Sequence, residues 1–146
     1  MRHESRLPSG PPTVAVTRRF TFSAAHRYAR PEWSDDENRA RFGPLATIHG
    51  HTYTLEVTLR GPVDPRTGMV VDLGELKQVV DETVLARFDH AFINDDPAFP
   101  PGVLPTTENL VRVVWDALAA KLGADRLARL RLWEDPTLYV DYWGEA

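Results

Sequence analysis

Two segments in the first half of the chain alternate apolar and polar residues. In residues 13–23 the apolar side chains share one parity, interrupted by Arg18; they are Val14, Val16, Phe20 and Phe22. In residues 51–60 the alternation is unbroken, with Tyr53, Leu55, Val57 and Leu59 on one side. Because successive side chains of a strand point to opposite faces, both segments predict half-buried β-strands.

Two later segments repeat their apolar residues with a helical period. Asp72, with Glu75 three residues on, predicts the start of a helix whose buried stripe comprises Leu73, Leu76, Val80 and Val84. A second helix is expected over residues 108–122, capped by Thr106 or Thr107.

The segments between these elements are richer in turn-forming residues. Residues 30–48 predict a long loop with a helical turn that starts at Ser34. Gly61-Pro62 predicts a turn, and residues 127–134 and 137–143 predict a closing β-hairpin.

This order of elements predicts an α+β domain. We expect a four-stranded, mostly antiparallel sheet with two helices on one face, formed by residues 13–146. Residues 1–12 are polar and rich in proline, serine and glycine, and we expect them to be a disordered tail. The two edges of such a sheet must be covered or paired, so edge-to-edge assembly into a homo-oligomer is a reasonable expectation.

Composition narrows the function classes. The 146-residue chain has a net charge of −4 and contains no cysteine. The charge gives no reason to expect a nucleic-acid or membrane partner, and no apolar run approaches the roughly 18 residues of a spanning helix. The absence of cysteine excludes thiolate metal ligands and is compatible with a reducing compartment, so we expect a cytoplasmic protein.

Three of the five histidines lie at the ends of the predicted strands. His49 and His51 are two residues apart, so in an extended chain their imidazoles share a face, and His26 continues the apolar parity of the first strand. An antiparallel pair would bring the three together. Three imidazoles with an open fourth position are typical of catalytic zinc, with nickel, iron or cobalt as alternatives. The competing interpretation is three separate histidines, each with its own hydrogen bonds.

Two acidic residues could act beside the histidines. Asp89 precedes His90, and a carboxylate can orient an imidazole to form a general-base pair; a polar helix end is the alternative. Glu134 shares the apolar parity of its strand, where a carboxylate is costly without a partner. It could accept hydrogen bonds from a ligand, or reach solvent and pair with an arginine.

Four further polar residues have two interpretations each. Thr106 and Thr107 can cap a helix, and their hydroxyls could also contact a heterocycle. Arg27 and Arg30 flank the first histidine and could bind phosphates, or they could be solvated surface residues.

A series of short motifs resembles the 6-pyruvoyl-tetrahydropterin synthase / 6-carboxytetrahydropterin synthase family. In chain order they are Phe22–Arg27, Asp36–Arg39 with Phe42-Gly43, His49–Tyr53, Gly68–Leu73, Phe88–His90 with Asn94-Asp95, Pro105–Asn109 and Trp133-Glu134. The resemblance implies the T-fold, in which the sheets of several subunits join into a barrel, as a trimer or a hexamer of two trimers.

The resemblance also implies a role for each candidate residue. His26, His49 and His51 would hold zinc, which polarises the side-chain hydroxyls of a reduced pterin such as 7,8-dihydroneopterin triphosphate. Glu134 would anchor the pterin ring with help from Thr106 and Thr107. Asp89 and His90 would belong to a proton relay. The implied activity is that of a lyase, and the pathway stays open between tetrahydrobiopterin-like, deazapurine (queuosine) and folate-related routes.

One position departs from the family pattern. Leu45 stands where the family has its cysteine base, and Gly43–Ile48 contains no aspartate, glutamate or histidine. Three hypotheses follow: a lyase whose base is His90, a metal-bound water or an acid of Asp35–Glu37; a pterin- or purine-binding protein without the family reaction; or an assembly protein with a vestigial site. We favour the first, because the metal ligands, relay and ring anchor occur together.

Overall fold

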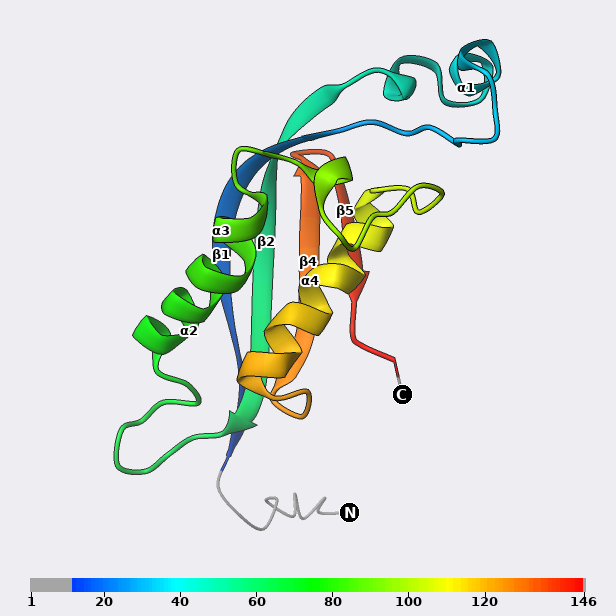
Figure 1. The fold of residues 1–146 in the computed structure, drawn as a ribbon. Coiled ribbons are helices and arrows are strands. Elements are labelled where there is room, and N and C mark those ends of the chain that lie inside the picture. The colour runs from blue at the N-terminus through cyan, green and yellow to red at the C-terminus, as the bar shows by residue number, and fades with distance from the viewer. Residues whose placement is uncertain (1–11, 146) are drawn as a thin grey trace.

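The computed structural model describes residues 12–145, which form one sheet with helices packed on one of its faces (Figure 1). The strands are β1 (Thr13–His26), β2 (His49–Pro62), β3 (Ala91–Phe92), β4 (Leu127–Asp135) and β5 (Leu138–Tyr142). The helices are α1 (Asp35–Phe42), α2 (Leu73–Val80), α3 (Ala86–Phe88) and α4 (Thr107–Leu122). Shorter turns are the 3₁₀ segments η1 (Gly43–Ala46) and η3 (Ile93–Asp95) and the π-turn η2 (Asp81–Leu85), which joins α2 to α3.

The sheet has the strand order β3-β1-β2-β4-β5. The expected α+β architecture, with two helical segments on one face of a mostly antiparallel sheet, is confirmed, but the expected number of four strands is wrong. The fifth strand, β3, pairs in parallel with β1 through only two residue pairs, Ala24↔Ala91 and Ala25↔Phe92. Two residues are too few to leave an alternating pattern in the sequence.

The pairing of β1 with β2 determines where the histidines lie. The two strands run antiparallel without a break in register, from Thr13↔Pro62 to His26↔His49. β2 therefore continues through Gly61-Pro62, where a turn was expected. A proline is tolerated there because β4 pairs with β2 only as far as Leu59, so that Pro62 lies on an edge of the sheet.

The hydrophobic core lies between the sheet and the helices. Its largest fully buried side chains include Phe22 of β1, Tyr53 and Leu55 of β2, and Leu130 and Leu132 of β4. These residues occupy the alternate strand positions that the sequence predicted to face the core. His26 and His51 occupy the same set of alternate positions, at one end of β1 and β2.

The helices begin largely where their caps predict. Asp72 accepts hydrogen bonds from the backbone N–H groups of Gly74 and Glu75, and Ser34 caps α1 by accepting from Glu37. Leu73, however, is 44% exposed, contrary to expectation. Helical side chains lean toward the N-terminus of their helix, so the first residue of α2 projects past its packed body.

The segment between β1 and β2, residues 27–48, forms an arch that carries α1 away from the sheet (Figure 1). Two asparagines fix the first part of this arch, and each forms hydrogen bonds with both the backbone N–H and the backbone C=O of a single residue. Asn94 binds the N–H and C=O of Arg27, and the buried Asn38 does the same for Arg30. The chain leaving His26 is thereby fixed in place.

The predicted tail of residues 1–12 lies, apart from Pro12, outside the described residues. Within residues 12–145, no helix has the length and apolar character needed to cross a membrane.

Candidate metal centre

The structure brings the three predicted histidines together at one end of β1 and β2. His26 and His49 are direct cross-strand partners, and His51 pairs with Ala24. One ligand atom from each imidazole lies within 4.8 Å of the other two. The ring centroids are 4.5 Å apart for His26 and His49, and 5.1 Å apart for the two pairs that include His51.

Backbone carbonyls orient two of the rings. The Nδ1 of His26 lies 2.8 Å from the carbonyl oxygen of Pro105, and that of His49 lies 2.8 Å from the carbonyl oxygen of Thr47. A carbonyl oxygen only accepts, so each Nδ1 donates and each Nε2 carries the free lone pair. This is the outer-shell arrangement that metal-bound histidines use.

The Nε2 atoms of His26, His49 and His51 are all buried, and none has a hydrogen-bond partner among residues 12–145. A buried polar atom without a partner is costly, and three facing one another call for a ligand that accepts three lone pairs. Burial and, to a smaller extent, repulsion by His49 and His51 lower the pKa of His26 to about 4, although the hydrogen bond to the Pro105 carbonyl opposes this shift. The cluster is therefore suited to a divalent cation, which requires neutral imidazoles.

Glu134, near the end of β4, lies beside this cluster. Its Oε1 is 3.4 Å from the Nε2 of His51 and 3.8 Å from that of His26, and it accepts a hydrogen bond from the Thr107 hydroxyl at 3.2 Å. The side chain is only 13% exposed. Among the described residues, no arginine lies within ion-pair distance of Glu134, so the interpretation of a solvated arginine partner is wrong.

The two threonines at the start of α4, Thr106 and Thr107, make different contacts. Thr106 is the N-cap, because its hydroxyl oxygen accepts from the Asn109 N–H at 3.1 Å. Thr107 is buried and directs its hydroxyl to Glu134. Pro105, one residue earlier, supplies the carbonyl that orients His26. The start of α4 thus contacts both the histidine cluster and the carboxylate.

Asp89 and His90 form a side-chain pair at the end of α3. The Nδ1 of His90 is 3.1 Å from Asp89 Oδ1, which also accepts the Ser23 N–H at 2.9 Å. That N–H and the neighbouring His90 hold the pKa of Asp89 below its usual value. His90 has a φ of 61°, and its side chain is 83% exposed. It does not belong to the histidine cluster, but it lines the same groove of about 450 Å³ as His51.

A tyrosine that the sequence analysis did not single out packs against the cluster. The Tyr28 ring lies edge-on to His26 at 5.0 Å and to His49 at 5.9 Å, and its backbone N–H donates to the Leu45 carbonyl at 2.9 Å. Burial, followed by the charges of Glu134 and Glu108, raises the pKa of Tyr28. The sequence could have indicated this position, because Tyr28 lies two residues beyond His26 and so continues the alternation of the first strand.

The two arginines beside His26 have different surroundings. The guanidinium of Arg30 donates to the Gly102 carbonyl at 3.2 Å and ties the arch to the loop before α4. Arg27 lines a cavity of about 340 Å³ together with Asp35 and Arg39. Asp35, Asp36 and Glu37 occupy the exposed first turn of α1, outside the histidine cluster.

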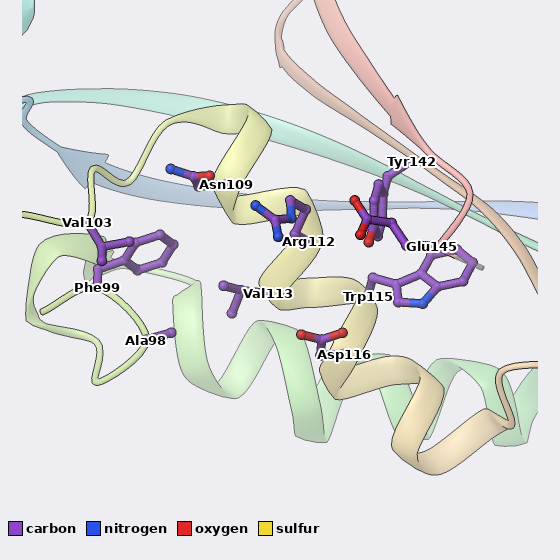
Figure 2. Close-up of a pocket in the computed structure, with 10 residues that line it drawn as sticks. All are labelled: Ala98, Phe99, Val103, Asn109, Arg112, Val113, Trp115, Asp116, Tyr142 and Glu145. Atoms are coloured by element: carbon purple, nitrogen blue, oxygen red, sulfur yellow. The ribbon is translucent and has the colours of Figure 1, made fainter.

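A separate cavity of about 480 Å³ lies between α4, residues 98–103 and the C-terminal segment (Figure 2). Aromatic side chains of Phe99, Trp115 and Tyr142 line it beside the charged Arg112 and Asp116. None of the predicted metal ligands, relay residues or ring-binding residues lines this cavity, so the candidate centre is the histidine cluster.

Comparison of the chain with known proteins identifies its family. Residues 15–145 match the family model described as 6-pyruvoyl tetrahydropterin synthase. The 6-pyruvoyl tetrahydrobiopterin synthase of Drosophila melanogaster is 39% identical over 136 residues, which are 91% of this chain and 81% of that protein. The Homo sapiens protein of the same name is 37% identical over 132 residues, 89% of this chain and 91% of its own.

The fold agrees with that assignment. The structure of Caenorhabditis elegans 6-pyruvoyl tetrahydropterin synthase superposes with a TM-score of 0.84 at 34% identity, covering 92% of this chain and 98% of that one. The expected T-fold is confirmed, and so is the expectation of a relationship to these synthases, which are lyases. This chain belongs to the 6-pyruvoyl tetrahydropterin synthase family.

Proposed function

We propose that this protein is a zinc-dependent lyase that acts on a reduced pterin such as 7,8-dihydroneopterin triphosphate, with side-chain elimination or cleavage of the 6-pyruvoyl- or 6-carboxy-tetrahydropterin synthase kind. One observation carries the proposal. The Nε2 atoms of His26, His49 and His51 lack hydrogen-bond partners among the described residues and lie close together beside the carboxylate of Glu134. The names of the relatives support the substrate class.

His26, His49 and His51 would hold the zinc ion through their Nε2 atoms. When bound, zinc supplies a Lewis acid that polarises hydroxyl or carbonyl oxygens of the substrate side chain. All three donors are nitrogen atoms, and the chain has no thiolate to complete a closed structural site. This donor set supports a centre that keeps a position open for substrate.

Glu134 would bind the pterin ring. A carboxylate accepts hydrogen bonds from amino and ring N–H groups, and a bidentate geometry makes such recognition specific. Thr107 holds Oε1 of this carboxylate through its hydroxyl, while Thr106 keeps the start of α4 in place and has a hydroxyl hydrogen left to donate. Burial of Glu134 strengthens each of these hydrogen bonds.

Asp89 and His90 would move protons to and from the substrate side chain. Asp89 orients the imidazole through Nδ1, which leaves the exposed Nε2 of His90 available to exchange protons. The groove that His90 shares with His51 supports a path toward the histidine cluster.

A second candidate function is pterin binding without the family reaction, and Leu45 is the observation that favours it. Leu45 is 42% exposed, its side chain cannot accept a proton, and the neighbouring Thr47 hydroxyl donates to the Pro44 carbonyl. Under this alternative the metal and ring sites are used for recognition alone.

We also propose that the chain works as a trimer or hexamer built by edge-to-edge joining of sheets. The edge of β1 that faces away from β2 supports this. Within residues 12–145, β3 pairs with that edge only at Ala24 and Ala25, and the rest of the edge has no strand partner. An uncovered edge of this length is a template for strand addition.

The deciding experiment is to incubate zinc-loaded protein with 7,8-dihydroneopterin triphosphate and identify the products by mass. Release of triphosphate or a shortened side chain is expected, and the product mass distinguishes the pyruvoyl from the carboxy reaction. Unchanged substrate together with zinc-dependent binding would overturn the lyase proposal in favour of the binding function.

A further inference from the structure

We propose that Tyr28 is a substrate-binding residue whose hydroxyl donates a hydrogen bond to an oxygen of the substrate side chain, on the wall of the site where Leu45 lies. This inference rests on the proposed function, since it concerns the same ligand. It goes further by assigning a role to a residue outside the metal ligands, ring anchor and relay.

The backbone places Tyr28 at this wall. The Tyr28 N–H donates to the Leu45 carbonyl at 2.9 Å, so the segment that leaves β1 and the segment that leads into β2 lie side by side at these two residues. The Asn94 side chain clamps both backbone groups of the preceding residue, Arg27. Tyr28 is therefore held at a fixed distance from His26 by interactions on both sides of the chain.

The ring of Tyr28 is also fixed. It lies edge-on to the imidazoles of His26 and His49, and to the Phe42 ring at 6.0 Å and an interplanar angle of 76°. The Phe42 ring in turn stacks on Trp33 at 6.0 Å. Aromatic contacts on two sides leave the ring little rotational freedom, so the direction of its hydroxyl is set before any ligand binds.

The hydroxyl itself has no protein partner. Among residues 12–145, no hydrogen bond joins the Tyr28 oxygen to another group, although the residue is half-buried. A tyrosine packed this closely usually bonds through its hydroxyl, as Tyr53 does with His26 Nδ1 at 3.4 Å. The Tyr28 ring contacts two of the three imidazoles, which places this side chain beside the histidine cluster.

The neighbouring side chains on this wall cannot supply the same hydrogen bond. Leu45 and Ile48 are apolar and exposed, and the Thr47 hydroxyl already donates to the Pro44 carbonyl at 2.7 Å. For a substrate side chain that reaches the histidines along this wall, the Tyr28 hydroxyl is therefore the group that remains free to form a hydrogen bond. An oxygen-bearing side chain is therefore the chemical class that Tyr28 selects.

The test compares the zinc-loaded wild type with Tyr28→Phe, which keeps the ring and removes the hydroxyl. Affinities are measured by fluorescence for two probes, 7,8-dihydroneopterin, which has a hydroxylated side chain, and 6-methyl-7,8-dihydropterin, which does not. Loss of one neutral hydrogen bond should weaken binding of the first probe by about 3- to 10-fold and leave the second unchanged. Tyr139→Phe on β5 is the matched control, and zinc content is measured for all three proteins.

Each outcome has a distinct meaning. Equal affinities of wild type and Tyr28→Phe for 7,8-dihydroneopterin overturn this inference and leave the proposed function standing. Equal weakening for both probes, or loss of zinc, would assign Tyr28 a packing role and also overturn it. Failure of the wild type to bind either probe would instead overturn the proposed function, and this inference with it.

Discussion

At the scale of single residues, the four histidines within residues 12–145 have different environments. His26, His49 and His51 face one another through buried Nε2 atoms, whereas His90 is almost fully exposed and pairs with Asp89. Strand parity in the sequence already distinguished the first three from His90. The backbone carbonyls that accept from His26 and His49 add what the sequence does not show, because they determine which ring nitrogen is free.

This contrast predicts the effect of removing one imidazole. His49→Asn should lower zinc affinity by roughly 100-fold or more, since even outer-shell partners of metal ligands are worth 10- to 100-fold. His90→Asn is the matched control and should keep the zinc content of the wild type. Metal analysis after dialysis against a weak chelator measures both, and equal zinc retention by the two variants would contradict the assigned ligands.

Leu45 predicts a gain of function. Leu45→Cys places a thiol where the resembling family has its base, on a segment already bonded to Tyr28 and close to the histidines. If the rest of the site is competent, we expect faster triphosphate release from 7,8-dihydroneopterin triphosphate, with Leu45→Ser as a control for side-chain size. No gain in rate from the cysteine would argue that this chain has a different reaction or none.

At the scale of elements, the site depends on how β1, α3 and α4 are tied to one another. The start of α4 supplies Pro105 and Thr107, and the segment after α3 supplies Asn94, which clamps the chain beyond His26. A bidentate ion pair between Arg87 of α3 and Asp96 anchors that segment, with both N···O distances at 2.6 Å.

The ion pair predicts a pH dependence of stability. The hydrogen bonds from Arg87 hold the pKa of Asp96 below its usual value. Above an unfolded-state pKa of about 3.9 the stabilisation is fully present, and it is lost as pH falls through the lower folded-state pKa, because the unfolded chain takes up the proton first. The difference in unfolding free energy between wild type and Arg87→Gln should therefore shrink from pH 5 to pH 2.5 in urea titrations; a constant difference would contradict it.

At the scale of the whole molecule, one face of the sheet is covered by helices and the other is polar. Glu56 is buried on that other face, where the Trp133 indole donates to it at 2.6 Å and the guanidinium groups of Arg19 and Arg129 lie within 4 Å. The outer edge of β1 adjoins this face. The Ser23 N–H and C=O both point away from β2, toward Asp89 and His90.

The direction of the Ser23 backbone identifies the residues that could pair with a second copy. Alternate residues of a strand direct their backbone groups to the same edge, so Thr21 presents its N–H there. Thr21→Pro should remove that donor while leaving the ladder to β2 intact, since prolines are tolerated at sheet edges. We expect a wild-type mass of three or six chains by light scattering and a smaller assembly for the variant.

The control is Thr21→Val, which keeps the N–H and should assemble like the wild type. Circular dichroism and zinc content establish that each variant is folded. A monomeric wild type would contradict the proposed assembly, and an undiminished Thr21→Pro oligomer would contradict the role of this edge.

Much of this architecture could be predicted from the sequence, because it follows from local periodicity and capping. Alternation located β1 and β2, and the caps located the starts of α1 and α2. A shared parity indicated that His26, His49 and His51 face the core. The family motifs added the T-fold. These features are local, since each depends on residues a few positions apart.

Only the tertiary structure decided the rest, because it depends on groups distant in sequence or on the backbone. The carbonyl of Pro105 that orients His26 is 79 residues away and has no side-chain signature. The Thr107–Glu134 hydrogen bond, the two-residue strand β3 and the contact of Tyr28 with two imidazoles arise only when strands and helices pack. Periodicity determines which face a side chain occupies, whereas its partner is determined by the packing of separate elements.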